Sequence, residues 1–136
     1  MTDSELIAKK LALIETCVPQ LRQLARPAAI TTDVREERFV EHTLQIAIQA
    51  ALDVASHIVS DRRLGEPRTN REMFDLVHRD GWLDTALAAS FKNMAGFRNV
   101  LVHGYDDVDL GVLRDVLANH LGDLESFVHS VRRRLG

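Results

Sequence analysis

The chain has 136 residues, of which 46% are hydrophobic and 27% charged, and its basic and acidic side chains leave a formal net charge of −3. This composition is typical of a single folded domain over residues 1–136, and aromatic residues, at 5%, are sparse for a sheet protein. The negative balance argues against broad electrostatic adhesion to nucleic acid or anionic lipid, so any contact with RNA must be local.

Two helices are predicted in the first half of the chain. Apolar residues recur at near-heptad steps from about Ser4 to Ala25, and Pro19 is expected to kink this helix because it removes one backbone hydrogen bond. Asp33-x-x-Glu36 is a capping-box pattern that opens a second, longer helix from Val34 to Leu64. The middle of the second helix is apolar nearly all round, so this helix must lie at the centre of the fold.

A line of polar residues interrupts the second helix. Gln45, Gln49, Asp53 and His57 follow one another at four-residue steps, and Asp53 and His57 can pair as i, i+4 neighbours. One interpretation is that the line bonds to neighbouring helices and helps to specify the core, since buried polar groups are usually satisfied. The other interpretation is that it faces the catalytic candidates described below and forms the second wall of a cleft.

The second half of the chain predicts one short and two long helices. Thr69-x-x-Glu72 caps a short helix that Gly81 stops, and a helix from about Leu83 to His103 follows. Aspartates within 106–109 then precede a last long helix over 110–135. No segment shows the alternation of a strand, so the sequence predicts an all-α fold, an antiparallel four-helix bundle with one additional short helix.

The end of the helix over 83–103 carries the polar residues on which chemistry would depend. Arg98 falls on the apolar stripe of this helix, four residues after Met94, and a buried guanidinium needs a carboxylate, a carbonyl cluster or a phosphate as its partner. Asn99 and His103 lie one helical turn apart, so both can face one cleft. Gly104 is expected to supply the left-handed residue that usually ends a helix, which places His103 in the last turn.

These side chains suit acid–base chemistry on a phosphate group. His103 can take and give a proton, Arg98 can hold a phosphate or a developing oxyanion, and Asn99 can orient either group. No metal site is predicted, because the six histidines lack the spacing of metal ligands and no cysteine assists them. No cofactor is predicted either, since the chain has no Gly-rich phosphate loop and no serine elbow.

The remaining features indicate a protein of the cytoplasm with no membrane contact. The N-terminal residues 1–5 are acidic and polar where a signal peptide would be basic and then apolar, and no apolar run reaches membrane-spanning length. Cys17 is the only cysteine, and its apolar helical setting predicts a packed thiol in a reducing compartment.

The spacing of the polar residues resembles the Arg-x4-6-His-x-Tyr signature of the HEPN superfamily, and most closely its HepT-like toxins. Here the signature comprises Arg98, four residues, His103, one residue and Tyr105. The likeness extends to Asn99 directly after the arginine, to Gly104 before the tyrosine, and to the order of the helices along nearly the whole chain. The resemblance implies a HEPN-like helical domain.

The resemblance also implies a metal-independent endoribonuclease toxin of a type VII-like toxin–antitoxin system, with Arg98, His103 and Asn99 as catalytic residues. A base would remove the proton of a ribose 2′-hydroxyl, the oxygen would attack the adjacent phosphate in line, and an acid would protonate the departing 5′ oxygen. One histidine does not readily perform both transfers, so a two-fold homodimer that brings together two copies of His103 is expected. The substrate would be RNA, whether tRNA or mRNA, because DNA lacks the 2′-hydroxyl.

Tyr105 has a separate role in the resemblance. A cognate MntA-like minimal nucleotidyltransferase antitoxin would neutralise the toxin by adenylylation of this tyrosine. Without the resemblance, a tyrosine whose ring packs and whose hydroxyl bonds locally is an equally good interpretation. An alternative function also stays open, namely a non-catalytic HEPN module that dimerises and binds a nucleotide or a nucleotidyltransferase partner.

Overall fold

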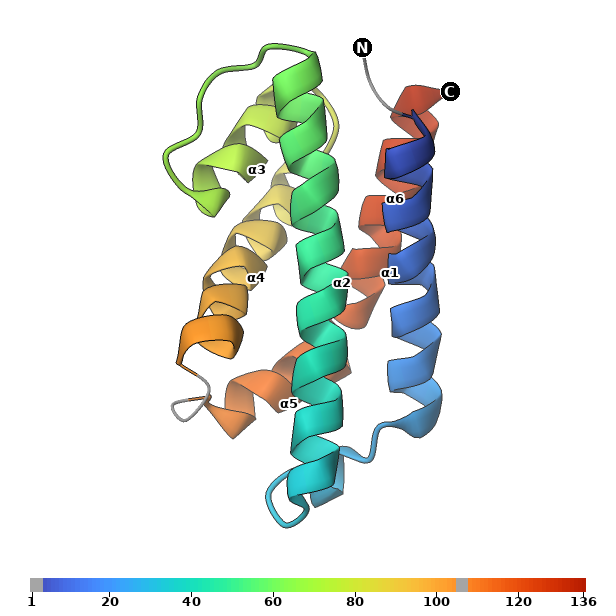
Figure 1. The fold of residues 1–136 in the computed structure, drawn as a ribbon, viewed down its shortest axis with the longest axis vertical. Coiled ribbons are helices and arrows are strands. Elements are labelled where there is room, and N and C mark those ends of the chain that lie inside the picture. The colour runs from blue at the N-terminus through green and yellow to red at the C-terminus, as the bar shows by residue number, and fades with distance from the viewer. Residues whose placement is uncertain (1–3, 105–107) are drawn as a thin grey trace.

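The computed structural model describes residues 4–104 and 108–136, and within these ranges it contains helices and no strand. Four long helices form an antiparallel bundle (Figure 1), which confirms the predicted fold class. They are α1 (Ser4–Leu24), α2 (Val34–Asp61), α4 (Thr85–His103) and α6 (Leu121–Leu135). Two short helices, α3 (Asn70–Arg79) and α5 (Leu110–Asn119), and a 3-10 turn, η1 (Pro27–Ala29), complete the described chain.

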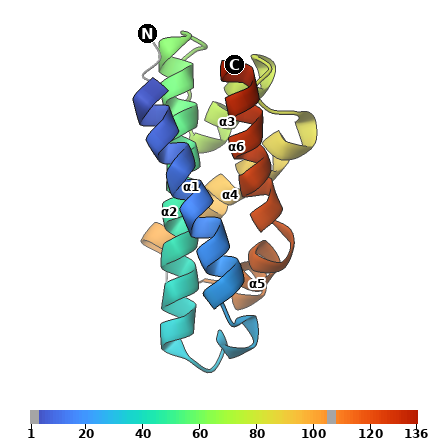
Figure 2. The same cartoon turned by 90° about the vertical axis from the view of Figure 1, so that its right-hand side faces the viewer.

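Helix α2 lies at the centre of the bundle, as its apolar sequence predicts. It runs between α1 on one side and α3 and α4 on the other (Figure 1), and Figure 2 shows α6 beside α1. Its buried side chains extend from Val40 to Val59 and belong to the same hydrophobic cluster as those of α1, α4 and α6. Burial of apolar surface against α1, α3, α4 and α6 therefore holds this helix in place.

Two of the long helices, α2 and α4, begin where an aspartate caps them. The Asp33 carboxylate accepts a hydrogen bond from the backbone N–H of Arg35, and the Asp84 carboxylate accepts one from Leu87. The capping box predicted at the start of α2 is only half formed, because the Glu36 carboxylate accepts its bond from the backbone N–H of Arg26 instead. Glu36 thereby ties the start of α2 to the turn that follows α1.

Aromatic side chains join α3, α4 and α6. The ring centroids of Phe74 and Phe91 lie 5.3 Å apart and those of Phe91 and Phe127 lie 4.8 Å apart, both pairs tilted. The turn before α4 is fixed by Trp82, whose indole N–H donates to Asp80 and whose backbone carbonyl accepts from Ser130. These contacts set the position of α4, the helix that carries the signature.

The last predicted helix is interrupted at His120, which separates α5 from α6. The expectation of one continuous helix over 110–135 is therefore wrong, and the bundle carries two short α-helices where one was expected. His120 has φ −123° and ψ −1°, which are not helical values. Val116 and Leu121 are both buried. In one regular helix, residues five apart do not lie on one face, so the interruption at His120 allows both halves to bury apolar side chains.

Candidate active site

The predicted catalytic residues occupy the last two turns of α4, at the end of the bundle where α5 begins (Figure 1). The apolar stripe of this helix is buried through Leu87, Phe91, Met94 and Leu101, as the sequence periodicity predicts. Arg98 lies on the same stripe and is half-buried, whereas Asn99 and His103 are exposed. The site is therefore built on a rigid helix whose packing fixes the direction of each side chain.

The Arg98 guanidinium is incompletely paired. Its Nη1 donates to Oδ1 of Asn99 at 3.3 Å, a long hydrogen bond, and its buried Nε has no partner among the residues that the structure describes. The sequence predicted a carboxylate, a carbonyl cluster or a phosphate as partner, and no carboxylate pairs with Arg98 within 4–104 and 108–136. A guanidinium held in this state can donate hydrogen bonds to an anionic oxygen, such as one from a phosphate.

His103 is the last residue of α4, and its imidazole is exposed. The helix ends at Gly104, whose backbone N–H donates to the carbonyl of Val100 at 2.9 Å. Gly104 has φ −127°, so the expectation of a left-handed glycine is wrong. The helix ends because ψ turns to 40° there, which points the chain away from the helix axis without needing positive φ. The predicted modification site, Tyr105, lies outside the described residues.

The polar line of α2 is held together by α1. The Gln49 amide donates to Oδ1 of Asp53 at 2.8 Å, and Nζ of Lys10, on α1, pairs with Oδ2 of Asp53 at 2.9 Å. His57 is half-buried one turn further along α2. These contacts support the interpretation of Gln49 and Asp53 as residues that specify the packing of α1 on α2, and they do not join Asp53 to Arg98 or His103.

A cluster of polar side chains at the α5–α6 junction was not predicted. Nδ1 of His120 bonds to Asp123 at 2.9 Å, and its Nε2 bonds to Asp115 at 3.1 Å. Carboxylates only accept hydrogen bonds, so both bonds form at once only when each ring nitrogen carries a proton, and this geometry favours the imidazolium form. The hydrogen bonds to Asp123 and then to Asp115 accordingly raise the pKa of His120. Ser90 of α4 donates to the same Asp123 oxygen at 2.6 Å and so links the junction to the signature helix.

A second unpredicted feature is Glu41, a buried carboxyl group near the start of α2. Only 6% of the residue is exposed, and its Oε1 has no hydrogen-bond partner in the described part of the chain. Burial, followed by the negative charge of Glu37, raises the pKa of Glu41 to about 6. The spacing of four residues between the two glutamates is a signal that sequence analysis could have used, although it does not reveal the burial.

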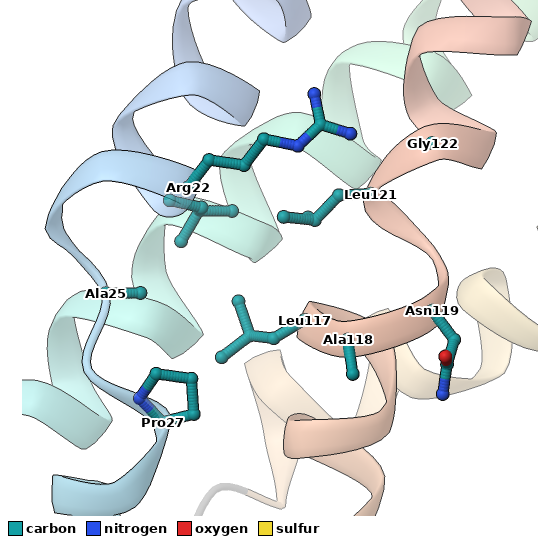
Figure 3. Close-up of a pocket in the computed structure, with 9 residues that line it drawn as sticks. Arg22, Ala25, Pro27, Leu117, Ala118, Asn119, Leu121 and Gly122 are labelled. Carbon is teal, nitrogen blue, oxygen red and sulfur yellow. The ribbon is translucent and has the colours of Figure 1, made fainter.

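Two cavities differ in their relation to the signature. One, of about 480 Å³, lies between the end of α1 and the α5–α6 junction, where Leu117 and Leu121 point toward the α1 side (Figure 3). Arg22 lies at its edge and is already paired with Glu125 at 2.6 Å, which leaves it poorly suited to a further anion. The other cavity, of about 130 Å³, lies between α4 and α5 and includes Phe97, the neighbour of Arg98.

Neither a metal site nor a membrane segment is found within the described ranges. No group of three or more histidine, cysteine, aspartate or glutamate side chains could hold a metal ion there. None of the described helices combines the length and apolar character needed to cross a membrane.

Comparison with known proteins relates the sequence to nucleases. A family model described as ribonuclease HepT-like matches residues 9–131. The mRNA nuclease HepT of Shewanella oneidensis is 28% identical over 130 residues, which cover 95% of this chain and 98% of that protein. The tRNA nuclease HepT of Aphanizomenon flos-aquae is 38% identical over 74 residues, which cover 54% of this chain and 50% of that protein.

A solved structure has the same fold over almost the whole chain. It is that of a tri-AMPylated HEPN toxin from Shewanella oneidensis in complex with an MNT antitoxin. The TM-score is 0.87 and the sequences are 29% identical, with 98% of this chain and 99% of that chain covered. The helical fold that carries Arg98 and His103 on α4 is thus shared with that toxin.

Proposed function

This chain belongs to the ribonuclease HepT-like family, and we propose that it is a metal-independent endoribonuclease, the toxin of a type VII-like toxin–antitoxin pair that works in the cytoplasm. One observation carries the proposal. At the end of α4, an exposed His103 lies five residues after Arg98, whose buried Nε has no partner in the described part of the chain. Among the described residues, a guanidinium with an unpaired Nε and an exposed imidazole lie at the same end of one helix, and these are the groups needed to bind and cleave a phosphodiester.

The roles follow from what each group can do. In the reaction a base takes the 2′-hydroxyl proton, the 2′ oxygen forms a bond to phosphorus, the bond to the 5′ oxygen breaks, and an acid protonates that oxygen. His103 provides the base or the acid. Arg98 binds the non-bridging phosphoryl oxygens as their charge grows, and Asn99, which already accepts from the guanidinium, orients it.

The second proton transfer requires a second group. We place it on another copy of this chain, in a two-fold homodimer whose two α4 ends share one cleft. Val100, on the exposed side of α4 between Asn99 and His103, is 38% exposed and offers apolar surface for such a contact. Residues 1–136 would act as one HEPN-like domain in this dimer.

Regulation by an antitoxin completes the proposal. The related toxin of Shewanella oneidensis is tri-AMPylated in its complex with an MNT antitoxin. We infer that a cognate nucleotidyltransferase attaches AMP to Tyr105, two residues after His103. The added anionic group would occupy the phosphate position at Arg98 and repel RNA by like charge.

The first experiment is cleavage of single-stranded RNA by the purified chain in excess EDTA. Cleavage products with 2′,3′-cyclic phosphate ends are expected, since the proposed reaction needs no metal. An absence of cleavage by a folded dimer, with or without magnesium, would favour the non-catalytic module that the sequence left open. Loss of activity in EDTA that magnesium restores would overturn metal independence alone.

The second experiment is intact-mass analysis after co-expression with the neighbouring nucleotidyltransferase. Added mass of one or more AMP groups is expected on the parent chain, and none on Tyr105→Phe, which keeps the ring and removes the acceptor oxygen. An unchanged mass increase in Tyr105→Phe would place the modification elsewhere.

A further inference from the structure

We propose that the cavity between α4 and α5 is a specificity pocket that receives one unpaired nucleobase of the RNA substrate, in preference a base with an exocyclic amino group. This inference rests on the proposed RNA cleavage at Arg98 and His103. It assigns a ligand class to a set of residues outside the signature. The pocket is lined by Ser90, Asn93, Met94, Phe97, Val112, Asp115, Val116 and His120.

The size of the pocket suits a single planar ring system. Its volume is about 130 Å³, the space of roughly four water molecules at ~30 Å³ each. Met94 and Val116 are buried and form its apolar part, whereas Asn93, Val112 and Asp115 are exposed. The exposed residues leave the pocket open to solvent, so a base can enter from a single strand without any movement of the bundle.

The walls combine the two features by which proteins recognise unpaired bases. Phe97 offers an aromatic ring for stacking, and Met94, Val112 and Val116 add apolar contact. The Asn93 amide and the Asp115 carboxylate supply hydrogen-bonding groups at the open side. A pocket that served only to fill a gap between helices would not need an amide and a carboxylate there.

The charges in the pocket select a base rather than a phosphate. Asp115 and Asp123 flank His120, so these three side chains together carry a net negative charge that repels anions from the pocket itself. Each oxygen of Asp115 accepts one bond, from Asn119 at 2.7 Å or from His120 at 3.1 Å, and keeps a second lone pair. Free lone pairs accept from the amino groups of adenine, cytosine or guanine, whereas the O4 of uracil would be repelled.

The pocket is held rigid before any ligand binds. The His120 ring is fixed at both nitrogens, and Ser90 fixes Asp123 from α4. These bonds set the distance between α4 and α5 and keep the Asp115 carboxylate in one orientation. A preorganised acceptor costs little entropy on binding and therefore discriminates well between bases.

The pocket also lies within reach of the reacting groups. Phe97 is adjacent to Arg98 and precedes His103 by six residues, about 9 Å along the axis of α4. A base that stacks on Phe97 therefore lies next to Arg98, and the adjoining nucleotide would span the further distance along α4, and about 120° around it, to His103. The pocket therefore reads the identity of a nucleotide next to the scissile bond.

The test compares cleavage-site profiles on an RNA pool of randomised sequence. The parent is expected to disfavour uracil at one position beside the scissile phosphate. Val112→Trp, which plugs the open side, and Asn93→Ala are expected to lose this preference and to lower kcat/KM on the favoured sequence by about tenfold, the usual effect of one base contact. Val34→Trp is the matched control, because Val34 is 66% exposed at the start of α2 and outside the pocket, and it should behave as the parent.

Binding separates this proposal from the proposed nuclease function. Fluorescence anisotropy with His103→Ala and short single-stranded oligonucleotides should show weaker binding of all-uracil strands, and Val112→Trp added to His103→Ala should remove the difference. This result would support the pocket even if the parent chain did not cleave RNA. Unchanged profiles and unchanged base-dependent binding in both pocket variants would overturn the proposal. The proposal would also be overturned if Val112→Trp changed the oligomeric state and left the cleavage-site profile unaltered. The pocket would then be a contact between protein chains.

Discussion

Two regions of this molecule that each contain a histidine differ in how completely their polar side chains are hydrogen-bonded. At the end of α4, His103 is exposed and the buried Nε of Arg98 has no partner among the described residues. At the α5–α6 junction, both nitrogens of His120 bond to carboxylates, and Ser90 bonds to one of these. Both regions include side chains of α4, so the difference in hydrogen bonding does not come from packing against different helices.

The comparison distinguishes a region suited to catalysis from a region that stabilises the fold. Native proteins satisfy nearly all buried polar groups, so a group left unsatisfied on a rigid helix has a reason beyond stability. Among the described residues the Nε of Arg98 is such a group, and Arg98 also belongs to the signature, whereas both ring nitrogens of His120 are bonded. We therefore expect substitutions at Arg98 and His103 to affect RNA cleavage with little effect on stability, and substitutions at His120 to do the reverse.

The largest expected effect is on catalysis. Arg98→Ala and His103→Ala should each reduce kcat for RNA cleavage by about 10²-fold or more, since each removes a group that acts in the transition state. Their free energies of unfolding should stay within about 1 kcal/mol of the parent, because neither side chain provides much packing. Chemical denaturation and initial rates on one RNA measure both quantities.

Two matched variants control for the loss of an arginine or a histidine. Arg35 and His129 are exposed on α2 and α6, so Arg35→Ala and His129→Ala should cleave RNA like the parent. Equal rates for the signature variants and these controls would show that Arg98 and His103 are not the reacting groups.

The next effect concerns the junction. His120→Ala leaves Asp115 and Asp123 facing each other without the cation between them, and it should lower the free energy of unfolding by about 1–2 kcal/mol. This value is that of hydrogen bonds to charged groups, reduced because the ring is 35% exposed. Urea denaturation at pH 6 gives the measurement, and His129→Ala, an exposed histidine on α6, is the control. A smaller loss of unfolding free energy in His120→Ala than in His103→Ala would show that the junction is not the more stabilising of the two regions.

The sequence could predict one of these regions and not the other, for a physical reason. Arg98 and His103 lie on one regular helix, so spacing alone placed them on α4, and the helical fold and the central position of α2 followed from periodicity in the same way. The junction depends on contacts between helices distant in sequence. Ser90 and Asp123 are 33 residues apart, and only their bond and the burial of Leu121 explain why the helix stops at His120.

The pocket beside Phe97 could not be predicted for the same reason. Its shape depends on the direction of α5, and the apolar spacing over 110–135 is consistent with a continuous helix that would point elsewhere. Arg98 illustrates a further limit. The sequence indicated that it needs a partner, but only the structure shows that no carboxylate of the described chain provides one.

A smaller effect is the pH dependence that the junction gives to stability. The pKa of His120 is raised in the folded state, so its contribution is complete below the unfolded value of about 6.5 and is lost as the pH rises through the higher folded value. The parent should therefore lose stability relative to His120→Ala between about pH 6.5 and the folded pKa. Thermal unfolding at half-unit pH steps checks this. Parallel curves for the two proteins across that interval would contradict the imidazolium at the junction.

The last prediction tests whether an unsatisfied group always indicates function. Glu41 also has an unpartnered oxygen, Oε1, among the described residues, yet its raised pKa of about 6 shows that its charge is a cost in the folded state. Because the folded carboxyl binds its proton more tightly than the unfolded one, stability falls as the pH rises from about 4.5 to 6 and stays lower above pH 6.

Glu41→Gln removes the charge and keeps the shape, and should therefore raise the free energy of unfolding at pH 7.5 by about 1–2 kcal/mol. Urea denaturation at pH 7.5 and at pH 4.5, where the gain should vanish, gives the measurement. If Glu41→Gln cleaves RNA like the parent, the buried carboxylate only destabilises the fold. A loss of activity comparable to that of Arg98→Ala would instead add Glu41 to the active site.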